Sequence, residues 1–189
     1  MNKAPRFVCI GGTTRAGSST ERALRYTALL LQEAGSTVDV FAGPELVLPM
    51  YSSRDALRSP VATRIVAALR EADGLVLASP GYHGGFSGLI KNVLDYLEDM
   101  SGDAAPYLRG RAVGCIASAF GWQAIGTTLL SLRSVVHALG AWPTPTGVSM
   151  ISTGRLFDDQ GRCVNEELDE QFRRLADELL EFARRRAAA

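Results

Sequence analysis

The sequence predicts an α/β fold of one domain, residues 1–189, in which helices cover both faces of a five-stranded parallel sheet. Strand-like and helix-like segments alternate along the chain, as in repeated βαβ units. The strand-like segments are nearly continuous apolar runs, which is typical of parallel strands buried on both faces. With 47% hydrophobic residues, the chain can fill a substantial core. Because crossovers between parallel strands are right-handed, the simplest strand order is doubly wound, 2-1-3-4-5.

The first strand and helix are separated by a polar loop. The apolar run Arg6–Ile10 predicts a strand that ends at two glycines. A loop rich in Thr, Ser and Gly then leads to a helix over Ser19–Glu33, whose apolar positions share one face. Gly35 ends this helix, and the alternating run Thr37–Phe41 is expected as the second strand.

The middle of the chain begins with a long connection. Residues 42–58 contain two prolines and are expected to be irregular, which is unusual at this length. Ser59 and Pro60 suit the N-cap and first position of the next helix. Gly74–Ala78 predicts the third strand. A third helix follows, with apolar residues at helical spacing: Ile90, Val93, Leu94 and Leu97.

The last third of the chain completes the alternation. Arg111–Ser118 predicts the fourth strand, and a glycine-bearing loop leads from it to another amphipathic helix. Trp142–Met150 is expected as the fifth strand, with two prolines fraying its start. Gly154–Val164 is a small excursion around a turn, and Glu166–Arg186 predicts a final amphipathic helix.

Charge and cysteine usage exclude several classes of function. The formal net charge is zero and no block of like charges occurs, which argues against a nucleic-acid partner or a membrane-binding surface. The three cysteines are far apart, without metal-ligand spacing, so we expect reduced structural thiols and no metal site. Met1–Pro5 leads into a strand without an apolar signal region, so the expected location is cytoplasmic.

The loop Gly12–Thr20, GTTRAGSST, is a candidate anion site. In a doubly wound sheet, ligands bind beyond the carboxyl ends of the strands, between strands one and three. The loop offers five hydroxyls, one guanidinium and the start of a helix, a combination that suits a phosphate. The competing interpretation is that Ser18 or Ser19 only caps the helix and Arg15 is a surface residue. The loop has neither a Walker A nor a GxGxxG pattern, so a single phosphate monoester fits better than a dinucleotide.

The segment Ser79–Asn92, SPGYHGGFSGLIKN, is a candidate site for a flat ligand. It follows the third strand and leads into a helix. Its glycines would let a ring approach the backbone, and Tyr82 or Phe86 could cover that ring; an ordinary glycine turn with a core tyrosine is the alternative. The loop Ser118–Gly126 adds small and aromatic residues from the fourth strand. His83 has no nucleophile motif nearby, so we assign no catalytic residue.

Both segments resemble motifs of the NADPH-dependent FMN reductase family, a branch of the flavodoxin-like fold. That family usually carries Gly-Ser-x-Arg-x-x-Ser-x-Asn after strand one, which Gly12–Thr20 matches in part. It usually carries Ser-Pro-Glu-Tyr-Asn-Gly-x-x-Pro-Gly-x-Leu-Lys-Asn after strand three, which Ser79–Asn92 matches more specifically. Gly81, His83 and Ser87 depart from the second motif, and there we expect differences in substrate choice.

The resemblance implies a flavodoxin-like three-layer sandwich that binds FMN and uses NADPH (or NADH) as co-substrate. In a ping-pong cycle, hydride would pass to flavin N5 and on to a small-molecule acceptor: free FMN, a quinone, an azo dye or a metal oxyanion. The alternatives are an electron-carrier flavodoxin without an NAD(P)H reaction, and a flavin-free phosphosugar- or nucleotide-binding protein. The family also suggests a homodimer or homotetramer. The implied cofactor-binding residues are Thr13, Arg15, Ser18, Ser19, Thr20, Pro80, Gly81, Tyr82, His83, Gly84, Gly85, Ser118 and Gly121.

Overall fold

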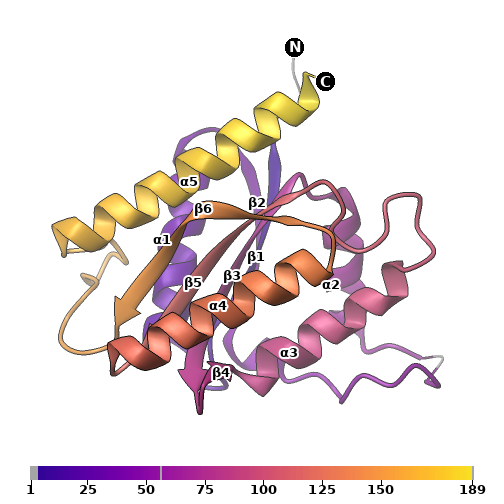
Figure 1. Ribbon diagram of the computed structural model, residues 1–189, viewed down its shortest axis with the longest axis horizontal. Helices are drawn as coiled ribbons and strands as arrows, with labels where there is room; N and C mark the ends of the chain where they lie inside the picture. Colours follow the sequence, from indigo (N-terminus) through magenta and orange to yellow (C-terminus); the bar gives the residue numbers. More distant parts are fainter. Residues whose placement is uncertain (1–3, 56, 189) are drawn as a thin grey trace.

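Five parallel strands form the central sheet of the computed structural model, which describes residues 4–55 and 57–188 (Figure 1). Met1–Lys3, which belong to the N-terminal segment considered in the sequence analysis, lie outside the described residues. The sheet order is β2-β1-β3-β5-β6, which confirms the predicted order 2-1-3-4-5 for the parallel strands. Their bounds are Arg6–Gly11 for β1, Thr37–Ala42 for β2, Gly74–Tyr82 for β3, Ala112–Ala119 for β5 and Trp142–Ile151 for β6.

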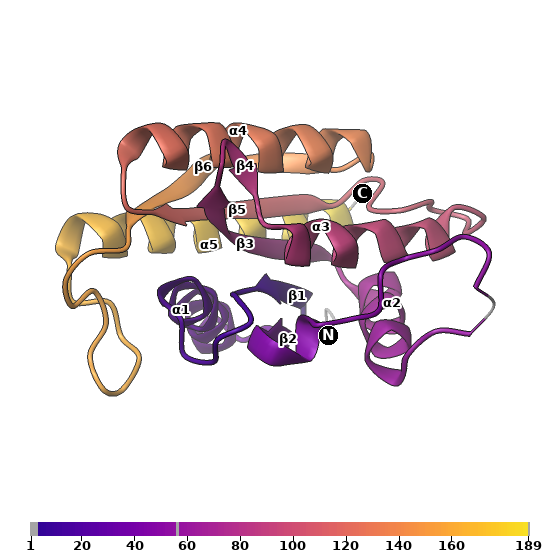
Figure 2. The ribbon, with the colours of Figure 1, turned by 90° about the horizontal axis from the view of Figure 1, so that it is seen from below.

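Helices cover both faces of the sheet (Figure 2). Successive side chains of a strand point to opposite faces, so β1 contributes side chains to the hydrophobic core on each face of the sheet. Val8 and Ile10 pack with α2, α3 and α4, whereas Phe7 and Cys9 pack with α1 and α5. No helix of the described residues has the length and apolarity needed to cross a membrane. The helix bounds are Ser19–Glu33 for α1, Pro60–Glu71 for α2, Gly88–Asp95 for α3, Trp122–Ala138 for α4 and Glu166–Ala187 for α5.

A β-hairpin interrupts the segment that was expected to turn directly into a helix. Strand β3 continues past Ala78 to Tyr82, and a two-residue strand β4, Gly85–Phe86, pairs back against it. The turn residues His83 and Gly84 have φ values of 49° and 92°. Both are positive, as a type I′ hairpin turn requires. The hairpin therefore projects from the carboxyl edge of the sheet before α3 begins.

The two prolines of β6 do not fray its start, contrary to expectation. The strand begins at Trp142, and Pro143 is in register with Val113. Because β6 lies at the edge of the sheet, a missing N–H need not break the ladder. The pairing of β6 with β5 is irregular only between Val113 and Cys115, where the register shifts.

Residues 43–55, 57 and 58 form a strap that is fastened to α3 and to the 3-10 helix η2, Tyr96–Met100. The connection starts with the 3-10 helix η1, Gly43–Leu46. The Asn92 side chain accepts a hydrogen bond from Tyr51 N at 2.8 Å and donates to the carbonyl of Pro49 at 3.0 Å. These hydrogen bonds hold the described part of this long connection against α3.

Candidate functional site

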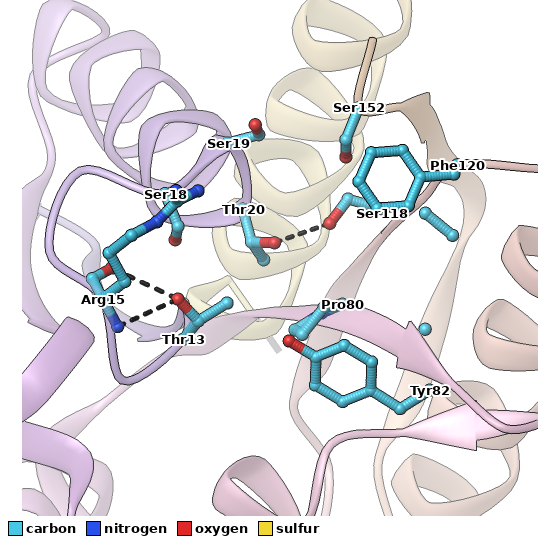
Figure 3. Close-up of a pocket in the computed structure, with 12 residues that line it drawn as sticks. Thr13, Arg15, Ser18, Ser19, Thr20, Pro80, Tyr82, Ser118, Phe120 and Ser152 are labelled. Atoms are coloured by element: carbon cyan, nitrogen blue, oxygen red, sulfur yellow. Dashed lines mark hydrogen bonds between the residues drawn. The ribbon is translucent and has the colours of Figure 1, made fainter.

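A pocket of about 310 Å³ lies beyond the carboxyl ends of the parallel strands (Figure 3). Its walls come from the loop after β1, the start of α1, the end of β3 and the ends of β5 and β6. These segments meet because carboxyl ends of parallel strands share one edge of the sheet. Nine residues that the sequence pointed to line it: Thr13, Arg15, Ser18, Ser19, Thr20, Pro80, Gly81, Tyr82 and Ser118.

The loop after β1 is held by its own hydroxyls. Thr13 Oγ1 accepts from Arg15 N at 3.1 Å and donates to the Arg15 carbonyl at 3.2 Å. Ser18 is the N-cap of α1, and its Oγ accepts from Glu21 N at 3.2 Å. Capping uses only the acceptor side of that hydroxyl, so its proton remains available to a ligand. The cap and the anion site are therefore compatible interpretations of the same residue.

Thr20 and Ser118 join the two sides of the pocket floor. Thr20 lies in the first turn of α1, and Ser118 lies near the end of β5. Their hydroxyl oxygens are 2.6 Å apart, and both side chains are buried (Figure 3). One hydroxyl must donate to the other, which leaves the second proton free to point elsewhere. The pair thus fixes α1 against β5 and can still offer one donor to a bound group.

The opposite wall is the last part of β3. Ser79 Oγ accepts from Ser87 N at 2.9 Å and donates to the Pro80 carbonyl, which ties the start of α3 to this strand. Tyr82 is 53% exposed, and its ring stands beside Pro80 at the pocket (Figure 3). Together with Phe120, which is 84% exposed, it gives the pocket two aromatic side chains that solvent can reach. Flat apolar surface of this kind suits an aromatic ring.

Gly81 is required by packing against α4. A Cβ at this position would lie 2.5 Å from Thr128 Oγ1 and 3.1 Å from the Ala124 carbonyl oxygen. An acidic side chain, which the resembling family usually has here, would collide with both groups. Ser87 likewise has a structural role, because its hydroxyl caps α3 by accepting from Ile90 N at 3.3 Å. Two of the three departures from the family motif therefore have explanations within the fold.

Four predicted site residues lie outside the pocket lining. His83, Gly84 and Gly85 belong to the hairpin turn and to β4, which carry them past the pocket. Gly121 is the N-cap residue of α4. Their predicted roles with a cofactor stay predictions at the rim of the site.

Three lining residues were not among the predicted set: Ala119, Phe120 and Ser152. The first two lie within the loop after the fourth predicted strand, which had been singled out only as a whole. Ser152 follows β6 directly. Ligands bind beyond the carboxyl ends of parallel strands, and β6 ends at the same edge of the sheet as the other strands. This principle could have identified Ser152 from the sequence.

The side chains that line the pocket suit FMN better than they suit a metal ion, and they include no carboxylate, imidazole or thiol for acid–base catalysis. Hydroxyls and the Arg15 guanidinium gather at one end, as a phosphate monoester requires, and aromatic surface lies at the other. No Asp, Glu, His or Cys lines this pocket. In the described part of the chain, no three or more side chains of those types gather in a way that could hold a metal ion.

Comparison with known proteins agrees with this geometry. The model of one family, described as NADPH-dependent FMN reductase, matches residues 5–155. An FMN-dependent NADPH-azoreductase of Staphylococcus saprophyticus is 27% identical over 183 residues, which is 93% of each chain. A probable NADPH:quinone oxidoreductase 2 of Oryza sativa is 26% identical, over 97% of this chain and 91% of that relative.

A solved structure shows the same fold. A flavodoxin, WrbA-like protein from Agrobacterium tumefaciens superposes with a TM-score of 0.64 at 16% identity, covering 96% of this chain and 99% of that one. At this identity the likeness concerns the fold alone. The arrangement of parallel strands and flanking helices is therefore flavodoxin-like.

Proposed function

The chain belongs to the NADPH-dependent FMN reductase family, and we propose that its pocket holds FMN and transfers reducing equivalents from NADPH to a planar small-molecule acceptor. As a member of this family it is an oxidoreductase with FMN as cofactor and NADPH as co-substrate. One observation carries the more detailed proposal. The hydroxyl-rich loop with Arg15 faces the aromatic wall of β3 across a single pocket.

The proposed phosphate site is the loop after β1. The guanidinium of Arg15 and the hydroxyls of Thr13, Ser18, Ser19 and Thr20 would bind the phosphate oxygens. Charge-assisted hydrogen bonds from a guanidinium are the strongest of these contacts. Ser118 would hold Thr20 in place through their shared hydrogen bond.

The proposed ring site is the wall formed by Pro80, Gly81 and Tyr82. Bound FMN would supply the redox chemistry, accepting hydride from NADPH and then passing electrons to the acceptor in a ping-pong cycle. The backbone N–H groups of His83 and Gly84 donate to no other described residue, so they would be available at the rim to stabilise negative charge on the ring. No side-chain acid or base is assigned.

The proposed acceptors are aromatic and planar, such as an azo dye or a quinone. Tyr82 and Phe120 both line the pocket with exposed aromatic rings, so a flat acceptor could stack against them. The names of two relatives, an azoreductase and a quinone oxidoreductase, support this class. Free FMN is a further candidate because the family description names it.

The experiment that tests the proposal measures flavin binding and its reduction. Purified protein incubated with FMN and desalted should retain flavin absorbance, and anaerobic NADPH should bleach it within seconds. Added azo dye or quinone should restore the oxidised spectrum. Flavin that binds but stays oxidised for minutes with NADPH would instead indicate an electron-carrier protein. Failure to retain any flavin would overturn the assignment of the pocket.

A further inference from the structure

A second pocket, of about 220 Å³, adjoins the proposed FMN site. Arg15 and Ser19 line both pockets, so the two are neighbours across the loop after β1. Three arginines line this second one, and we name it the arginine pocket: Arg15 from the loop, Arg22 from α1 and Arg155 from the segment after β6. No Asp or Glu lines it. Three arginines along the lining of one small pocket favour an anionic ligand.

The acidic residues nearby in sequence do not neutralise the arginine pocket. Glu21 is buried, and its carboxylate accepts from Arg25 Nε at 2.8 Å and from Gly17 N at 2.9 Å. Arg155 forms a pair with Asp159 at 3.0 Å, but the two side chains are 65% and 97% exposed, so this pair contributes little. Within residues 4–55 and 57–188, no ion pair involves the side chain of Arg15 or Arg22.

We propose that the arginine pocket binds the 2′-phosphate of NADPH and selects NADPH over NADH. The proposal rests on the proposed function, in which NADPH approaches a ring bound in the adjoining pocket. The FMN phosphate already has its own donors, because four hydroxyl-bearing residues from the loop after β1 and the start of α1 line the first pocket. Neither Arg22 nor Arg155 lines that first pocket, so these two residues are left for a second phosphate group. A phosphate monoester can accept two parallel hydrogen bonds from a guanidinium. NADH has a hydroxyl in place of the 2′-phosphate, so it cannot accept this pair of bonds.

The kinetic test compares NADPH with NADH in Arg22→Gln and Arg155→Gln. We expect the KM for NADPH to rise about tenfold in each variant, the change produced by losing one charge-assisted hydrogen bond. The KM for NADH should change by less than twofold. The matched control is Arg174→Gln, which removes the same charge from an exposed position on α5 and should alter neither KM. Equal effects on both nucleotides, or no effect on either, would overturn the proposal and leave the reductase function intact.

A binding test separates this site from the FMN phosphate site and does not depend on turnover. Calorimetry of the FMN-loaded protein should show adenosine 2′,5′-bisphosphate binding at least tenfold more tightly than 5′-AMP, and Arg155→Gln should reduce that difference about tenfold. Weaker FMN binding in Arg155→Gln would assign the arginine pocket to the flavin phosphate and overturn the proposal. If NADPH does not reduce bound FMN at all, the proposed function fails. In that case, tight binding of the bisphosphate would still establish the arginine pocket as a phosphate site. Failure of the bisphosphate to bind would exclude that site.

Discussion

The hydroxyl oxygens of Thr20 and Ser118 lie 2.6 Å apart, although 98 residues separate them in sequence. Both side chains are buried, at 2% exposure each, at the floor of the proposed FMN pocket. A buried hydroxyl without a partner is costly, so each residue depends on the other. This hydrogen bond links the start of α1 to the end of β5 at the pocket.

Replacing Ser118 by Ala should destabilise the protein and weaken FMN binding together. The change leaves the buried Thr20 hydroxyl unpaired, so the free energy of unfolding should fall by about 1–3 kcal/mol. Urea denaturation without FMN measures the first effect, and FMN titration measures the second. The control is Ser134→Ala at an exposed position of α4, which should change stability by less than about 0.5 kcal/mol. Equal losses in the two variants would contradict the role of the buried pair.

Arg15 should matter more to FMN than Tyr82. Arg15→Ala removes the guanidinium from the phosphate end, and the Kd for FMN should rise at least tenfold. Tyr82→Phe removes only a hydroxyl and keeps the aromatic surface, so the Kd should change by less than about threefold. Quenching of flavin fluorescence on binding measures both values. Affinity of Arg15→Ala equal to that of the unchanged protein would remove Arg15 from the phosphate site.

Gly81 and Gly85 form a matched pair for testing the packing of the hairpin. A Cβ at Gly81 would lie 2.5 Å from Thr128 Oγ1, whereas a Cβ at Gly85 would have nothing within 4 Å. Gly81→Ala should therefore lower the free energy of unfolding by about 1–3 kcal/mol, the usual cost of overpacking. Gly85→Ala should be nearly neutral. The double change Gly81→Ala with Thr128→Ala should recover part of the loss, and no recovery would place the strain elsewhere, such as at the Ala124 carbonyl oxygen.

The order of the parallel strands could be predicted because apolar runs alternate with helices and crossover handedness leaves few topologies. The hairpin at His83–Gly84 could not. Strand β4 has two residues, too few for a periodic pattern, and histidine is less typical than asparagine before the turn glycine. The residues that sequence motifs singled out after β1 line the pocket, and their role with FMN stays a prediction. They did not reveal that Gly81 makes room for Thr128, because this contact joins elements far apart in the chain.

Only one of the three thiols should react readily in the folded protein. Cys9 and Cys115 are buried, and burial raises the pKa of Cys115 to about 12 and that of Cys9 still further above its usual range. The thiolate is the reactive form, so both should be inert at pH 8. Partial burial also raises the pKa of Cys163, but this thiol is partly exposed and should account for the single reaction of the folded protein with a thiol reagent. Urea should release the other two, and Cys163→Ser should abolish the native signal; rapid labelling of two native thiols would contradict the buried positions.

The pair of Arg58 and Asp99 fastens the strap to η2. Arg58 Nε and Nη2 each donate to Asp99 at 2.8 Å, and a third nitrogen, Nη1, donates to the carbonyls of Ser52 and Asp55. The guanidinium also lies over the ring of Tyr51, 4.8 Å from its centroid. One side chain thus holds two backbone carbonyl groups of the strap.

The contribution of Asp99 to stability should disappear in acid. The hydrogen bonds from Arg58 hold the pKa of Asp99 below its usual value of 3.8. A carboxyl whose pKa is lower in the folded state stabilises the fold above its unfolded pKa, and this stability is lost as the pH falls through the folded pKa. Asp99→Asn should therefore cost about 1 kcal/mol at pH 7, since the pair is only partly buried, and progressively less below about pH 4. Urea denaturation at pH 7 and pH 3, with exposed Asp177→Asn as control, checks this difference; a cost that is unchanged at pH 3 would show that the loss comes from packing and not from charge.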